Sequence, residues 1–108
     1  MRRPFGFSDI ILIDVRTTAE FDSGHIPGAI HLDYQAPDFS EKVAALDRTA
    51  VYLVYCRGGV RSARAMQIMQ RMGFSRVYNL QGGLNRWQAD GRPIVKPVVD
   101  SSSDEKQP

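Results

Sequence analysis

Two uninterrupted apolar runs, at residues 10–13 and 51–55, restrict the folds open to this chain more than any other feature. The first reads Ile-Ile-Leu-Ile and the second Val-Tyr-Leu-Val-Tyr, so neither alternates apolar with polar positions. Continuous runs of β-branched and aromatic residues are typical of strands buried on both faces, as in a parallel sheet that helices cover on each side. The sequence therefore predicts an α/β domain with a mostly parallel sheet.

Capping and turn residues around these runs predict the remaining elements. Thr17 or Thr18 begins a short helix, Glu20 stands three residues after Thr17 as in a capping box, and Gly24 ends the helix. The other expected elements are a brief strand at 29–32, helices at 38–46, 61–72 and 84–89, and a strand at 77–80. Strands and helices in alternation predict three layers, with about four to five strands flanked by helices.

Length and composition indicate one globular domain. The chain has 108 residues, of which 43% are hydrophobic, and this suffices for a core without disulfides or metal. We expect residues 1–95 to form the domain and the polar residues 96–108 to form a disordered tail. No run approaches the roughly 18 residues of a membrane span, and the first residues lack the apolar region of a signal peptide. We therefore expect a soluble, cytoplasmic monomer that binds neither membranes nor a cofactor.

The single cysteine, Cys56, lies where the second apolar run ends and a helical pattern begins. One thiol excludes an internal disulfide, a CxxC redox pair and a multi-thiolate metal site. The glycines that follow it permit positive φ, so that backbone amides turn toward one centre, and the next helix directs its N-terminal amides at the same place. The sequence therefore predicts a thiolate held by the loop Arg57, Gly58, Gly59, Val60, Arg61 and Ser62, with Asp14 and Arg16 as supports from the neighbouring strand end.

The charges are distributed unevenly along the chain, although the net charge is only +2. Residues 1–47 carry eight acids and four bases, whereas residues 48–89 carry seven arginines and no acid. Cys56 therefore lies in a basic segment, which favours an anionic substrate. We expect Arg57 and Arg61 to help lower the pKa of the thiol, and the low total charge argues against nucleic acid as a partner.

Three stretches together resemble the rhodanese family of sulfurtransferases, over residues 10–95. The most specific is Phe21 followed by His25-Ile26-Pro27-Gly28-Ala29-Ile30-His31-Leu32, which is similar to the N-terminal signature of the family. The loop from Cys56 to Ser62 resembles its active-site loop, and residues 77–87 resemble its C-terminal signature, with Leu84 and Arg86 departing from the pattern. The resemblance implies a rhodanese-like three-layer domain, with the strand and helix that usually precede residue 10 reduced.

The resemblance also implies an activity. Cys56 would accept a sulfane sulfur as a persulfide and pass it to cyanide, to a small thiol or to a protein acceptor. The basic residues Arg57 and Arg61 favour thiosulfate or a similar small anionic donor over 3-mercaptopyruvate. An amide nest that already stabilises the thiolate requires no general base.

Three alternatives compete with this interpretation. Cysteine-dependent phosphatases and arsenate reductases resemble C-x5-R, but Arg61 follows Cys56 by five places and the sixth position is Ser62. A non-catalytic rhodanese-like module that binds a partner or senses sulfur would not need the cysteine. His25 and His31 suggest a Cys–His dyad, but we expect both to be structural, and we expect no metal site.

Overall fold

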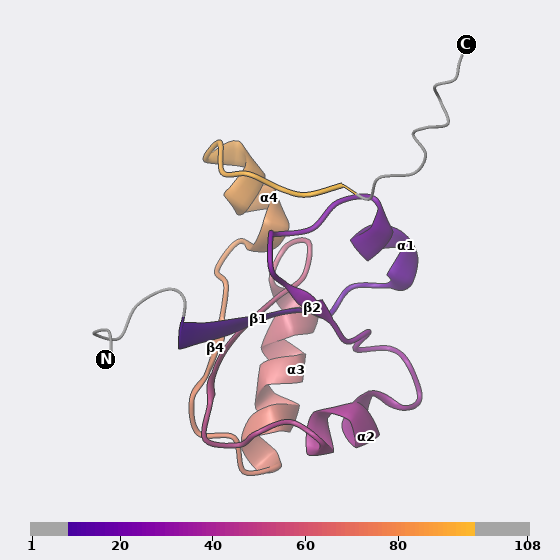
Figure 1. The fold of residues 1–108 in the computed structure, drawn as a ribbon, viewed down its shortest axis with the longest axis vertical. Helices are drawn as coiled ribbons and strands as arrows, with labels where there is room; N and C mark the ends of the chain where they lie inside the picture. The colour runs from indigo at the N-terminus through magenta and orange to yellow at the C-terminus, as the bar shows by residue number, and fades with distance from the viewer. Residues whose placement is uncertain (1–8, 97–108) are drawn as a thin grey trace.

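The computed structural model describes residues 9–96, which form a four-stranded parallel sheet flanked by helices (Figure 1). The strand order is β2-β1-β3-β4. In chain order the elements are β1 (Ile10–Asp14), α1 (Thr18–Asp22), β2 (Ile30–His31), α2 (Phe39–Ala44), β3 (Val51–Tyr55), α3 (Val60–Arg71), β4 (Val77–Asn79) and α4 (Gly83–Ala89). The predicted α/β fold with a parallel sheet is confirmed.

The register brings the chemically interesting residues to one edge of the sheet. Asp14 ends β1 opposite Tyr55, the last residue of β3, and opposite His31 of β2. All three pairings in the sheet are parallel, so the carboxyl ends of the strands meet at this edge. Cys56 follows Tyr55 directly and therefore lies at the same edge.

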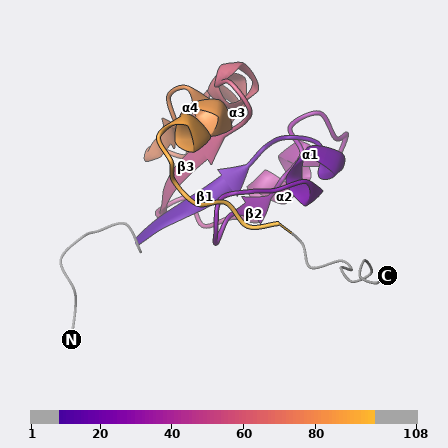
Figure 2. The ribbon, with the colours of Figure 1, turned by 90° about the horizontal axis from the view of Figure 1, so that it is seen from above.

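Both faces of the sheet are covered, as the two apolar runs predict. Alternate residues of β3 contribute to two different cores. Tyr52 and Val54 enter the larger core with α2 and α3, whereas Tyr55 enters a smaller core with Leu84 of α4. Figure 2 shows α1 and α4 apart from one another, with the ends of the strands between them. Each large side chain buried in this way contributes about 1.5 to 3 kcal/mol.

The larger core is built on one stripe of α3. Ala65 and Met69 are fully buried, and Ile68 and Met72 pack against them from the side. Gly73 follows with a φ of 100°, the left-handed conformation that ends a helix. The apolar stripe of this helix is therefore part of the core.

The predicted elements differ from the observed ones mainly at their ends. The capping box at Thr17 and Glu20 is present as expected. α2 ends at Ala44 instead of residue 46, and β4 ends at Asn79 instead of residue 80. The predicted tail, 96–108, lies outside the described residues except for Lys96, and so do residues 1–8.

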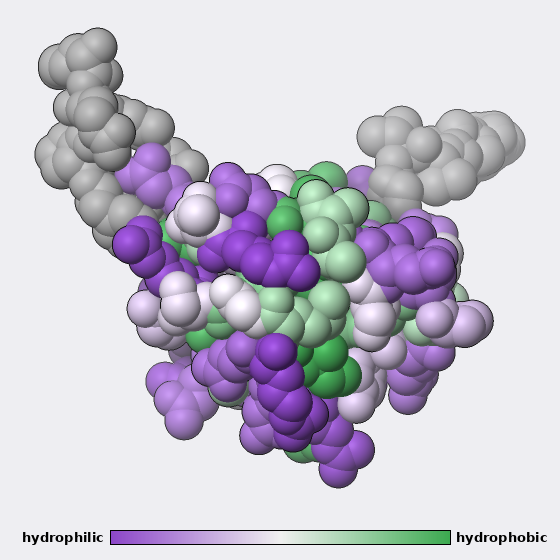
Figure 3. Space-filling model, turned by 90° about the horizontal axis from the view of Figure 1, so that it is seen from below, coloured by the Kyte–Doolittle hydropathy of each residue, from purple (hydrophilic) through white to green (hydrophobic). Residues whose placement is uncertain are grey.

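Within residues 9–96, no helix is long and apolar enough to cross a membrane. The face of the molecule in Figure 3 is mostly hydrophilic at its rim, with apolar side chains gathered toward its middle.

Candidate active site

The Cys56 thiol is almost completely buried, with 2% of the residue exposed. Its sulfur accepts a hydrogen bond from the backbone N–H of Gly59 at 3.0 Å, and the Ser62 Oγ lies 3.3 Å from it. Gly59 has a φ of 109° and is the N-cap of α3. This left-handed conformation, which suits glycine, turns the amide back toward the sulfur.

The surroundings of the thiol favour its ionised form. Burial by itself raises the pKa of Cys56, because it penalises the charged form. Hydrogen bonds from the Ser62 hydroxyl and from the backbone amides of Ser62, Gly59 and Gly58 outweigh this effect, so the pKa of Cys56 is lowered. The expectation that loop amides stabilise a thiolate agrees with this geometry.

The two loop arginines contact a partner that the sequence analysis did not assign to them. Both guanidinium nitrogens Nη1 and Nη2 of Arg61 donate to the Glu20 carboxylate, at 2.8 and 3.1 Å. The Nε of Arg57, an exposed residue, lies 4.0 Å from the same carboxylate. The Arg61 hydrogen bonds are the largest reason why the pKa of Glu20 falls to about 2. Arg61 still interacts electrostatically with Cys56, but its hydrogen bonds are with Glu20.

Glu20 therefore connects α1 with the cysteine loop. Its Oε1 also accepts hydrogen bonds from the N–H and the hydroxyl of Thr17, as the capping box requires. Sequence analysis did not connect Glu20 with Arg61, because the residue lies 41 positions before Arg61 and belongs to the acidic part of the chain.

Asp14 and Arg16 form a second pair, which is buried, with 0% and 2% exposed. The Arg16 guanidinium donates to both Asp14 oxygens and, at 2.6 Å, to the Gly24 carbonyl. Arg16 is paired with Asp14, which lies two residues away on the same strand end, so the two predicted supports contact each other. The pair fixes the end of β1 and the turn that follows α1.

The amino end of α4 holds the cysteine loop from the other side. Leu84 and Asn85 donate their backbone N–H groups to the Cys56 and Arg57 carbonyls, each at 2.9 Å. A Cβ on Gly83 would come within 2.6 Å of both carbonyl oxygens. A side chain at this position would push α4 away from the loop, so the close packing of the two segments requires glycine.

One residue near the sulfur was missed entirely in the sequence analysis. Asn79, the last residue of β4, lies with its Oδ1 2.6 Å from the Ser62 Oγ and donates from Nδ2 to the Gly59 carbonyl at 3.1 Å. Its place at the carboxyl end of a predicted strand was a usable signal, because such ends surround the sites of parallel sheets.

The two histidines have structural partners. His25 and His31 both stack on the Phe21 ring, with centroid distances of 3.8 and 4.6 Å. Their ring nitrogens contact the carbonyls of Phe21 and Arg16. Neither ring forms a hydrogen bond with Cys56 among the described residues, so no Cys–His dyad forms there. The same part of the chain contains no group of three or more His, Cys, Asp or Glu side chains arranged to hold a metal ion.

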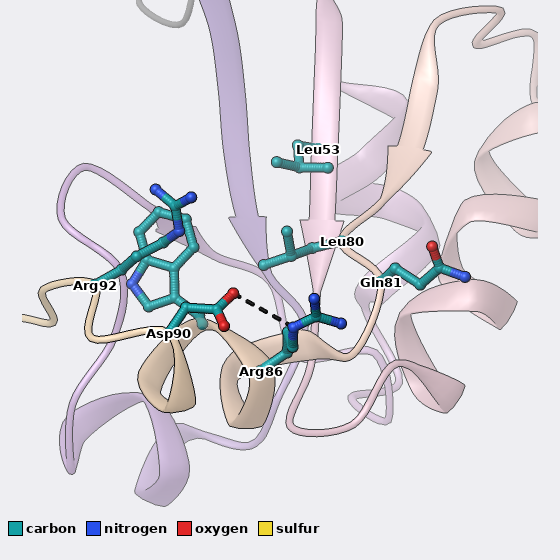
Figure 4. Close-up of a pocket in the computed structure, with 7 residues that line it drawn as sticks. Leu53, Leu80, Gln81, Arg86, Asp90 and Arg92 are labelled. Atoms are coloured by element: carbon teal, nitrogen blue, oxygen red, sulfur yellow. Dashed lines mark ion pairs between the residues drawn. The ribbon is translucent and has the colours of Figure 1, made fainter.

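A pocket of about 460 Å³ lies beside α4, away from the cysteine (Figure 4). Three of its charged side chains have partners, since Arg86 is paired with Asp90 at 3.3 Å and the Arg92 guanidinium lies over the Trp87 ring. The lining residues are Leu53, Leu80, Gln81, Arg86, Trp87, Asp90 and Arg92.

Comparison with known proteins assigns the family. Residues 2–90 match the family model described as the Rhodanese-like domain. The chain belongs to the rhodanese family. The cysteine loop and the turn at His25 both lie within the matched residues.

Several curated relatives of this rhodanese are named as sulfurtransferases. It is 39% identical to a sulfurtransferase of Allochromatium vinosum over 89 residues, which covers 82% of this chain and 81% of that protein. It is 37% identical to the thiosulfate sulfurtransferase GlpE of Coxiella burnetii over 82 residues, or 75% of this chain and 74% of that one. The crystal structure of a rhodanese-related protein from Thermoplasma volcanium superposes with a TM-score of 0.76 at 29% identity, covering 83% of this chain and 87% of that one. These relatives support a transferase that handles sulfur.

Proposed function

We propose that this rhodanese is a thiosulfate sulfurtransferase in which Cys56 carries the sulfur. The observation that carries the proposal is a buried sulfur that accepts from the Gly59 amide and lies beside the Ser62 hydroxyl, with a lowered thiol pKa. A nucleophile of this kind needs no histidine to activate it. The name of the Coxiella burnetii relative supports thiosulfate as the donor.

The reaction has two steps. The Cys56 thiolate attacks the outer sulfur of thiosulfate, a sulfur–sulfur bond to the cysteine forms, and sulfite leaves with the electron pair of the bond that breaks. Cyanide, a small thiolate or a protein thiolate then attacks the outer sulfur of the persulfide and releases the Cys56 thiolate. Loop amides that stabilise the thiolate also stabilise the anionic persulfide, so the same donors serve both halves of a ping-pong cycle.

Arg57 and Arg61 would attract the anionic donor and orient it. Together with Glu20 they leave one net positive charge beside the thiol, because one carboxylate interacts with both guanidinium groups.

Mass measurement tests the proposal directly. After incubation with thiosulfate, the intact protein should gain one sulfur, about 32 Da, as a persulfide on the cysteine. Cys56→Ser should abolish both this addition and turnover while the variant stays folded, and turnover that persists would rule out the nucleophile. A phosphate-release assay on the same preparation tests the rival activity.

The role of Arg61 can be tested separately. Arg61→Ala leaves the Glu20 carboxylate beside the loop with Arg57, at 4.0 Å, as its remaining cation, so we expect a raised pKa of the thiol and a KM for thiosulfate about threefold to tenfold higher. The pH profile of Cys56 alkylation and steady-state kinetics measure the two effects. An unchanged profile would contradict an electrostatic role for this arginine.

A further inference from the structure

The Ser62 hydroxyl lies between two acceptors but has only one hydrogen to donate. Its Oγ is 3.3 Å from the Cys56 sulfur and 2.6 Å from the Asn79 Oδ1, and Ser62 is completely buried. A serine hydroxyl donates one hydrogen bond at a time. The sulfur and the amide oxygen therefore compete for the same proton.

The hydrogen-bond partners of Asn79 determine which of its side-chain atoms faces Ser62. The second contact of the side chain is with the Gly59 carbonyl at 3.1 Å, and a carbonyl can only accept. The amide nitrogen must point there, which leaves the amide oxygen toward Ser62. Asn79 thus contacts both Ser62 and Gly59, the two residues whose side chain and backbone surround the sulfur.

The charge on the sulfur decides which acceptor receives the hydrogen bond from the Ser62 hydroxyl. A neutral thiol sulfur is a weak acceptor, whereas an amide oxygen is a good one. A thiolate is charged, and hydrogen bonds to a charged acceptor are roughly twice as strong as neutral ones. The preferred partner of the Ser62 hydroxyl therefore changes when Cys56 ionises.

We propose that Asn79 is a positioning residue whose amide oxygen accepts the hydrogen bond of the Ser62 hydroxyl while Cys56 is a thiol. When the thiol ionises, the hydroxyl donates this hydrogen bond to the sulfur instead. The thiol hydrogen leaves to solvent, the sulfur keeps the electron pair, and the serine hydroxyl turns from the amide oxygen to the sulfur without losing its hydrogen. Asn79 thereby stabilises the thiol form and limits how far the loop favours the thiolate. The inference concerns ionisation alone, so it holds whichever sulfur donor the enzyme uses.

The charged groups near the loop are paired with one another. Glu20 is paired with Arg61 and lies close to Arg57, and Asp14 is paired with Arg16. None of these side chains forms a hydrogen bond with Ser62 or Asn79 among the described residues. Substitutions of Ser62 and Asn79 therefore test which acceptor receives the hydrogen bond of the serine hydroxyl, without altering the ion pairs.

A double-mutant cycle on the pKa of the thiol tests the inference. The four proteins are the parent, Asn79→Leu, Ser62→Ala and the double variant, and the readouts are the pH profile of Cys56 alkylation and the ultraviolet absorbance of the thiolate. Leucine has the branched shape of asparagine but no hydrogen-bond acceptor. If Asn79→Leu does not fold, Asn79→Ala takes its place in the cycle.

We expect Asn79→Leu to lower the pKa of the thiol when Ser62 is present, because the hydroxyl is then free for the thiolate. Losing a competing neutral hydrogen bond should raise the alkylation rate below the pKa about threefold to tenfold. In the Ser62→Ala background the same substitution should produce no such increase. Any effect through the Gly59 carbonyl appears in both backgrounds and cancels in the comparison.

Equal shifts in the two backgrounds, or a larger decrease in pKa without the serine, would overturn the inference. Sulfur transfer is not needed for either readout. A protein that fails to form a persulfide can therefore still support or refute the role of Asn79.

Discussion

Two carboxylate–arginine pairs lie near the cysteine loop, and they serve different purposes. Asp14 and Arg16 are buried at 0% and 2% exposure, two residues apart on one strand end. Glu20 and Arg61 are about a quarter exposed and join α1 to the cysteine loop across 41 residues. The buried pair fixes the backbone beneath the site, whereas the outer pair sets the charge beside the thiol.

The difference follows from the surroundings of each pair. A buried guanidinium must keep its partner, since an unpaired charge away from water is costly. A pair near the surface is partly solvated, so losing it costs less stability, but its charge still reaches a neighbouring thiolate. Substitution of Asp14 should therefore cost more stability than substitution of Glu20, whereas substitution of Glu20 should change the reactivity of the thiol more.

Asp14→Ala should have the largest effect on stability. It leaves the buried Arg16 guanidinium without the carboxylate that accepts from its Nε and Nη2, and breaking a buried pair in this way costs about 3 to 5 kcal/mol of unfolding free energy. Urea or thermal unfolding measures the loss. As a control, Asp38→Ala removes an exposed pair with Lys42 at 3.6 Å and should cost less than about 0.5 kcal/mol. Similar losses for the two variants would contradict the distinction.

Glu20→Ala should cost less stability but change the thiol. It removes the capping-box carboxylate and the partner of Arg61, so we expect a loss of about 1 to 2 kcal/mol. Removing a negative charge beside the sulfur should also lower the pKa of Cys56 further. Alkylation rates against pH and urea unfolding test both parts, and an unaltered thiol profile would show that Glu20 acts on α1 alone.

Thr17→Ala separates the two roles of Glu20. It removes the hydroxyl that accepts from the Glu20 N–H at 3.2 Å but leaves the carboxylate bonded to Arg61. We expect a loss of about 1 kcal/mol from the weakened cap, with the alkylation profile of Cys56 unchanged. A shifted profile would mean that the cap itself positions the loop.

Acid should remove the contribution of the Glu20–Arg61 ion pair to folding stability, which is the smallest of these effects. The pKa of Glu20 is lowered from its ordinary 4.5 to about 2, chiefly by the hydrogen bonds from Arg61. The unfolded chain therefore binds this proton before the folded protein does, so the contribution is complete above pH 4.5 and disappears as the pH falls toward 2. The stability difference between the parent and Glu20→Gln, about 1 kcal/mol or less, should shrink over that range. Glutamine keeps the capping box, and a difference that does not depend on pH would contradict the assignment.

Much of the fold was predictable because its signals are local. The apolar runs in β1 and β3, the capping box at Thr17 and the glycine after α3 each depend on residues within one element or its ends. The cysteine loop was predictable for the same reason, since Gly59 and Ser62 contact Cys56 from three and six residues away. The signature at His25 then identified the family.

The electrostatic environment of the thiol was not predictable in this way. Counting charges along the chain puts seven arginines and no acid at 48–89, and Glu20 in a segment of opposite sign. In space the Glu20 carboxylate lies against Arg61 and Arg57. The basic character of that segment is therefore partly neutralised at the point where it borders the sulfur.

The amino-acid sequence by itself determined which segments are strands and helices, where the single thiol stands, and which amides can turn toward it, because these follow from spacing along a continuous backbone. Only the tertiary structure decided that Arg61 pairs with Glu20, that α4 holds the Cys56 carbonyl, and that Asn79 competes with the sulfur for the Ser62 proton. These contacts join separate elements, and packing of the sheet and helices sets the distances between them.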